Sequence, residues 1–106
     1  MSYDKTLLQV SIITENKNYD NIRYLIDNIT DIDYQDNLGN TALVYAVIYN
    51  DYRTVKMLLK AGSNYDLENA DGMSALEISS LEGVNEEIRN ELIGMISDSY
   101  YTWADS

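Results

Sequence analysis

The chain is 106 residues long, with 18 Asp and Glu against 7 Lys and Arg, a formal net charge of −11 and a hydrophobic fraction of 45%, as expected for one globular domain. It contains no His and no Cys, which excludes an imidazole base, a thiolate nucleophile, a zinc site and a disulfide framework. Seven basic residues scattered among eighteen acidic ones give the wrong electrostatic field for phosphates, so direct binding of nucleic acid is not expected.

The chain repeats itself at an offset of 33 residues. Glycines and small or apolar residues recur in register at this spacing: Gly39 with Gly72, Thr41 with Ser74, Ala42 with Ala75, Leu43 with Leu76, and Val55 with both Ile22 and Ile88. Ordered matches of this kind are typical of repeat proteins, whose units bury their faces against one another. We therefore expect one domain over residues 1–106, with units at 3–33, 34–66 and 67–97 and an acidic, aromatic tail at 98–106.

The first unit begins without a recognisable targeting signal. Residues 1–5 do not lead from a basic stretch into an apolar one, so no signal peptide is expected. No apolar run approaches the about 20 residues that span a bilayer. We therefore expect a cytoplasmic protein that does not bind membranes. Further along this unit, Ile22, Leu25 and Ile26 have helical spacing, and Tyr24 beside them is expected to pack, as is Tyr45 in the next unit.

Two short helices are predicted in the middle unit. Apolar residues at i, i+3 and i+4 mark both of them: Leu43, Ala46 and Val47 in the first, and Val55, Leu58 and Leu59 in the second. Thr41 is placed to cap the first helix, Asn50 and Asp51 separate the two, and Gly62 supplies the left-handed residue that ends the second. Helices of two to three turns are not stable alone, so stacking of the units is required.

These segments closely resemble an ankyrin repeat, most specifically DNLGNTAL at 36–43 followed by VKMLLKAGSN at 55–64. NADGMSAL at 69–76 is a second match, and the first unit resembles an N-terminal capping repeat. The resemblance covers nearly all of the chain up to about Met95. It implies an all-α solenoid of three helix-turn-helix units joined by short β-turn or hairpin connections.

The third unit departs from the family pattern. Asn90 and Glu91 stand where the family has apolar residues, which indicates a C-terminal capping repeat with a polar face. Alternatively, the last helix shifts its register and buries a different set: Ile88, Leu92, Ile93 and Ile96. The tail that follows contains Tyr100, Tyr101 and Trp103, and it either folds back on the last helix or is loose.

No catalytic, cofactor-binding or metal-binding residue is predicted. Asp31, Asp33 and Asp36 resemble the start of a calcium loop, but the Gly at its sixth position and the Glu at its twelfth are missing. Glu86 and Glu87 suggest a pair of catalytic carboxylates, yet the start of a helix explains them better through its dipole. The single glycines form no phosphate loop, and no serine has a base to activate it.

A protein-binding surface remains. In the ankyrin family the turn tips and the exposed side of each first helix line a concave face. Carried over by position, the resemblance places eleven residues there: Asn37, Leu38, Asn40, Ile48, Tyr49, Glu68, Ala70, Asp71, Met73, Leu81 and Glu82. Apolar and Tyr side chains bordered by acids are typical of a surface that binds another protein.

The acidity indicates a basic partner, because complementary charge accelerates association. The leading interpretation is a small inhibitor or immunity-type protein, a monomer or weak dimer, that occludes a toxin, a nuclease or a nucleic-acid-binding protein. The alternative is an adaptor that bridges two proteins, with its acidity incidental. A third interpretation, a hydrolase that uses carboxylates such as Glu82 or Glu87, has the least support.

Overall fold

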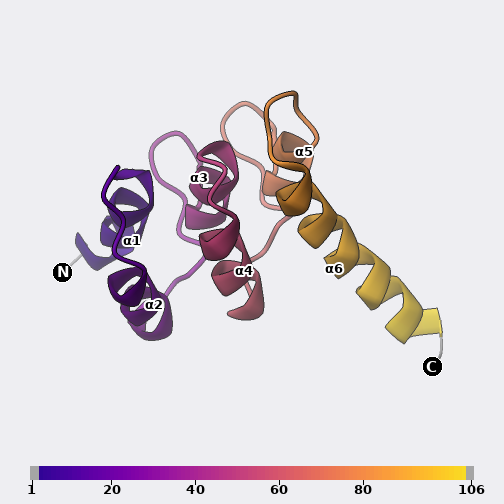
Figure 1. Cartoon of the computed structure of the whole chain (residues 1–106), viewed down its shortest axis with the longest axis horizontal. Helices are drawn as coiled ribbons and strands as arrows, with labels where there is room; N and C mark the ends of the chain where they lie inside the picture. The colour runs from indigo at the N-terminus through magenta and orange to yellow at the C-terminus, as the bar shows by residue number, and fades with distance from the viewer. Residues whose placement is uncertain (1–2, 105–106) are drawn as a thin grey trace.

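Six helices and no strand form the part of the chain that the computed structural model describes, which is the backbone of residues 3–104 and the side chains of residues 7–96. In chain order the helices are α1 (Tyr3–Ile13), α2 (Tyr19–Asn28), α3 (Ala42–Ile48), α4 (Tyr52–Lys60), α5 (Ala75–Ser79) and α6 (Glu86–Ala104). They form three successive helix pairs, α1 with α2, α3 with α4 and α5 with α6 (Figure 1).

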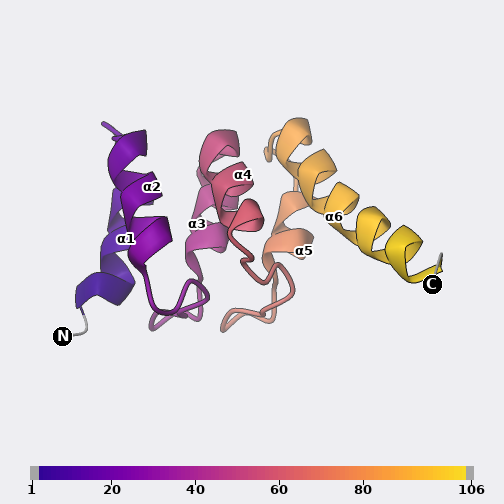
Figure 2. The same ribbon diagram turned by 90° about the horizontal axis from the view of Figure 1, so that it is seen from below.

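The pairs stack in two layers. Helices α1, α3 and α5 contact one another in sequence along the first layer, and α2, α4 and α6 do so along the second (Figure 2). The long connections at 29–41 and 61–74 protrude together from the same edge of the stack. This arrangement confirms the all-α solenoid of helix-turn-helix units that the resemblance implies.

Short polar side chains define where four of the helices begin. Each N-cap side chain accepts a hydrogen bond from the backbone N–H three residues later: Asn18 before α2, Thr41 before α3, Asp51 before α4 and Ser74 before α5. The predicted cap at Thr41 is therefore confirmed, with Oγ1 accepting from the Val44 N–H at 3.2 Å. Gly62, with a φ of +96°, follows α4 as predicted, because a left-handed residue ends a helix with little strain in glycine.

One continuous core runs between the layers. Its buried apolar side chains come from all six helices: Leu8, Ile12, Ile22, Ile26, Ala42, Leu43, Val44, Ala46, Val47, Val55, Leu58, Leu59, Ala75, Ile78, Ile88 and Leu92. Val55, Leu58 and Leu59, the apolar residues predicted to form one face of the second helix of the middle unit, are all buried in α4. Tyr45 packs against this core as expected, but the prediction for Tyr24 is wrong, because 64% of its surface is exposed.

Helix α6 keeps the register of the repeat. Ile88 and Leu92 are fully buried, whereas Ile93 is 47% and Ile96 40% exposed, so the alternative in which all four are buried is wrong. The helix extends to Ala104 and so includes most of the predicted tail, whose side chains lie outside the described residues. Over residues 3–104, none of the helices combines the length and hydrophobicity that crossing a membrane requires.

Candidate protein-interaction surface

The first hairpin tip, residues 36–40, is held by its own hydrogen bonds. The Asp36 backbone N–H donates to the carbonyl of Asn40 at 3.0 Å. The Asp36 side chain, through Oδ1, accepts from the N–H groups of Leu38 at 3.0 Å and Asn40 at 2.9 Å. A turn closed in this way presents the side chains of its central residues outward with little conformational freedom.

The second hairpin tip, residues 69–73, repeats this construction. The Asn69 N–H donates to the carbonyl of Met73 at 2.9 Å. Its Oδ1 accepts from the N–H groups of Asp71 at 2.9 Å and Met73 at 3.0 Å. An amide oxygen here takes the place of the carboxylate at residue 36, so the turn geometry is kept while one negative charge is removed.

The two tips are joined directly. The Ala70 N–H donates to the carbonyl of Leu38 at 2.9 Å, and the Asn69 amide donates to Oδ1 of Asn40 at 3.0 Å. Asn40 is only 8% exposed, which corrects its predicted place on the open surface: its side chain connects two units and is not free to contact a partner. The two hydrogen bonds therefore fix the tips to each other.

A second contact joins the loops at the far ends of α3 and α5. Asn50, a left-handed residue with a φ of +54°, donates through its side chain to the carbonyl of Gly83 at 3.0 Å. Its Oδ1 accepts from the Asn85 N–H at 2.7 Å. Asn tolerates this conformation better than most residues. The loop contact fixes the ends of α3 and α5 relative to each other.

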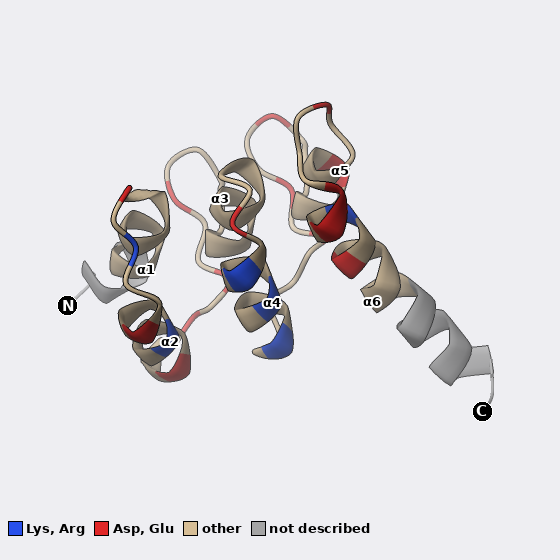
Figure 3. Ribbon diagram, viewed as in Figure 1, with Lys and Arg blue, Asp and Glu red and all other residues tan. Residues whose placement is uncertain are grey.

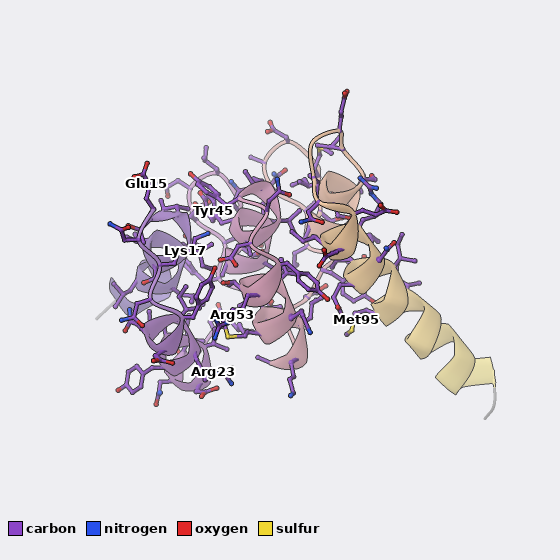
Figure 4. All side chains as sticks on the ribbon, in the orientation of Figure 1. Glu15, Lys17, Arg23, Tyr45, Arg53 and Met95 are labelled. Carbon is purple, nitrogen blue, oxygen red and sulfur yellow. The ribbon has the colours of Figure 1, made fainter. Side chains whose placement is uncertain are left out.

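Tyr45 connects the first hairpin tip to α3. Its hydroxyl donates to the Asp36 carboxylate, and its ring packs against the core. The side chain of Tyr45 is labelled in Figure 4. Burial, followed by this hydrogen bond, raises the pKa of Tyr45 above its ordinary value, so the hydroxyl remains a donor at neutral pH. Because Ile48 and Tyr49 lie one turn further along the same helix, the tip and the end of α3 form one supported surface.

Nine of the eleven predicted partner-binding residues are exposed. The large apolar ones are Leu38 (62% exposed), Ile48 (47%), Tyr49 (48%) and Leu81 (46%). The others are Asn37, Glu68, Ala70, Asp71 and Glu82. We call these nine the recognition surface. Met73 is half-buried against the core, and Asn40 is buried. The surface thus combines large apolar side chains with three carboxylates.

The carboxylates considered for metal binding have structural partners. Oδ1 of Asp31 accepts from the Asp33 N–H at 3.2 Å, and Oδ1 of Asp33 accepts from the Asn64 N–H at 2.8 Å. They therefore brace the hairpins in the same way as Asp36. Glu86 and Glu87 lie in the first turn of α6, where the sequence places them and where the helix dipole stabilises negative charge.

The basic residues are not all scattered, so that part of the sequence interpretation is wrong. Four of the seven come together between α2 and α4: Arg23, Arg53, Lys56 and Lys60. The sequence contains a pattern that could have predicted this cluster. The last three are spaced i, i+3 and i+7, which is one face of a helix, and residue 23 is one repeat before residue 56.

Comparison with known proteins agrees with the geometry. Residues 7–98 match the family described as ankyrin repeats in three copies. The chain is 33% identical over 79 residues to an ankyrin repeat protein of Acanthamoeba polyphaga mimivirus, covering 68% of this chain and 13% of that protein. It is 36% identical over 72 residues to the Notch-regulated ankyrin repeat-containing protein of Xenopus laevis, covering 64% of this chain and 63% of that one.

The chain thus spans less than two thirds of the length of either relative. Ankyrin repeats are protein–protein interaction modules and are typically not enzymes, and neither relative's name refers to a catalytic activity. The matched repeats account for most of the chain and coincide with the stacked helix pairs and paired hairpin tips. By this match and this architecture, the chain belongs to the ankyrin repeat family.

Proposed function

We propose that this chain binds a basic partner protein through the recognition surface and occludes part of that partner. The observation that supports this is the composition of the surface. Leu38, Ile48, Tyr49 and Leu81 are each about half exposed or more, and the carboxylates of Glu68, Asp71 and Glu82 are exposed among the same elements. Large side chains on a hydrogen-bonded backbone supply the buried contacts of an interface. The acidic residues around them favour a partner with a positively charged surface.

The supporting hydrogen bonds strengthen the proposal. A surface that is ordered before binding loses less conformational entropy when the complex forms. The bond from Ala70 to Leu38 and the bonds of Asn50 to the next loop fix the tips and the helix ends in the free protein. The inhibitor-type function needs this property, because a small surface must hold its partner tightly to block it.

Truncation of two apolar residues tests the surface. We expect Leu38→Ala and Tyr49→Ala each to weaken partner binding by about 1–3 kcal/mol, as loss of an interface anchor does. Both side chains are largely exposed, so the melting temperature should change little. Partners are captured on immobilised protein from the native source, and the affinity of each identified partner is measured by calorimetry.

A double variant, Val10→Ala with Ile93→Ala, is the matched control, because these side chains are 54% and 47% exposed but lie outside the recognition surface. It is compared with the double variant Leu38→Ala with Tyr49→Ala. If the control weakens partner binding as much as that double variant does, the partner does not use this surface, and the proposal is contradicted. Association should also slow as salt rises, because salt screens the attraction between exposed charges. A rate independent of salt contradicts the basic character of the partner.

The stoichiometry separates the inhibitor from the adaptor. An inhibitor saturates at one basic partner per chain and abolishes the activity of that partner. An adaptor binds two partners at once and leaves their activities intact.

A further inference from the structure

The second layer of helices carries a positive groove on an otherwise strongly acidic protein. The groove lies between α2 and α4, and the positive charges along both helices are visible in Figure 3. Four bases, Arg23, Arg53, Lys56 and Lys60, and one carboxylate, Asp27, line it, for a local charge of +3. The rest of the chain has three bases and seventeen acids, a charge of −14. A repeat protein that used its charge only for solubility would not separate the signs in this way.

The groove offers both charged and apolar contacts to a ligand. Its volume is about 510 Å³, and its apolar lining consists of Ile26, Met57 and Ala61. The three bases of α4 follow one face of that helix over seven residues, about 10 Å at 1.5 Å per residue. Arg23 projects from α2, on the other wall of the groove (Figure 4).

None of the four cationic groups forms an ion pair with a described carboxylate, although Asp27 lines the same groove. Among the described side chains, residues 7–96, the one ion pair joins Lys17 to Asp51, and neither lines the groove. Aromatic rings hold two of the groove's bases instead. The Arg53 guanidinium lies 4.5 Å from the ring centre of Tyr19, and the Lys56 ammonium 5.3 Å from that of Tyr52. A cation over a ring is oriented while its charge remains available to a ligand.

We propose that this groove binds an acidic segment of a partner protein, with carboxylates paired to the bases on its two walls and an apolar side chain on Ile26 and Met57. The apolar lining favours a peptide over a simple anion, which would use only the charged rim. A long polyanion such as nucleic acid is disfavoured, because it would extend over the surface that carries −14. Charge complementarity therefore selects a short acidic peptide.

This site is separate from the recognition surface. The groove residues lie in α2, in α4 and directly after α4. The recognition surface instead uses the hairpin tips and the ends of α3 and α5. The two sites attract partners of opposite charge. Binding of an acidic segment here is compatible with occlusion of a basic partner at the recognition surface, and simultaneous binding at both sites is what the adaptor interpretation requires.

The test uses the full chain and a short fluorescein-labelled peptide of repeated Leu-Glu-Glu, with a Leu-Gln-Gln peptide for comparison. Fluorescence anisotropy should show binding of the acidic peptide at low salt, and much weaker binding of the neutral one. Replacing Lys56 and Lys60 together with Gln should raise the Kd for the acidic peptide about tenfold, because two exposed charge pairs with the peptide are lost. Both positions are exposed and Gln is a good helix former, so the fold is expected to persist.

The matched control is Val10→Glu with Thr14→Glu, two exposed positions in the last turn of α1 and directly after it, in the other layer. This variant and the groove variant both carry a net charge of −13. Equal loss of affinity in the two, or no binding at low salt, overturns the proposal. Competition by inorganic phosphate as effective as that by unlabelled peptide also overturns it, in favour of a simple anion site. Sedimentation that shows self-association of the wild type, lost in the groove variant, assigns the groove to a second copy of the chain and overturns the proposal as well.

Discussion

Replacing Asp51 with alanine is expected to lower the free energy of unfolding by about 3–5 kcal/mol, the usual cost of removing one partner from a buried charge pair. The Asp51 side chain is 1% exposed, and its Oδ2 lies 3.1 Å from Nζ of Lys17. Oδ1 accepts from the Tyr19 hydroxyl at 3.0 Å and from the Thr54 N–H at 3.2 Å, which caps α4. One carboxylate thus joins the first unit to the second, and equilibrium urea denaturation measures its loss.

Asp51→Asn separates the contribution of the negative charge to stability from that of the side-chain shape. Asn retains an acceptor that caps α4, so this variant should be less destabilised than Asp51→Ala. Burial alone raises the pKa of Asp51, but hydrogen bonds from Thr54, Lys17 and Tyr19 outweigh it, and the net pKa lies below its ordinary value of 3.8. A carboxyl with a lowered pKa stabilises the folded state above the unfolded pKa, and this contribution is lost as the pH falls through the folded value.

The stability difference between wild type and Asp51→Asn should therefore be constant above about pH 5 and shrink as the pH falls below 3.8. Asp66→Asn is the control, because residue 66 is exposed and the same substitution there should change stability by no more than about 0.5 kcal/mol. A difference between wild type and Asp51→Asn that persists at low pH shows that the variant loses packing rather than charge.

Much of this fold could be predicted from sequence because each unit is defined by local signals. Helical spacing places Leu43, Val47 and Leu58 in the core, and a hydroxyl at residue 41 begins α3. Repetition at 33 residues then identifies Ile88 and Leu92 as the buried residues of α6, since the same position in each unit meets the same neighbours.

Surface properties were less predictable because they depend on contacts between units. Asn40 looks like a polar tip residue, but it is buried, with hydrogen bonds from Asn69 of the next hairpin and from Gln9 of α1. Tyr24 lies beside a core stripe in the sequence, yet α2 exposes it. The charged groove needs two helices from different units, so neither helix alone predicts it. Propensity and periodicity act within a unit, whereas these features arise where two units meet.

Gly39→Ala is expected to lower the free energy of unfolding by about 2–5 kcal/mol, for two additive reasons. The residue has a φ of +77°, where a side chain costs about 1–2 kcal/mol. A Cβ built on it lies 2.7 Å from the backbone nitrogen of Ala70 and 2.9 Å from Cα of Asn69, so overpacking adds about 1–3 kcal/mol. The atoms that it meets are backbone atoms, which cannot move without breaking the bond from Ala70 to Leu38.

Comparison with Gly72→Ala separates the cost of the close approach from the cost of the left-handed backbone. Gly72 occupies the same position in the next unit with a φ of +78°, but a Cβ there meets nothing within 4 Å. Its substitution should therefore cost only the backbone strain of about 1–2 kcal/mol. Urea denaturation of both variants gives the difference, which is the energy of the close approach between the two hairpin tips. If the two glycines cost the same, the tips are free to separate and Leu38 and Ala70 are not held together in the unbound protein. Their preorganisation for a partner would then be lost.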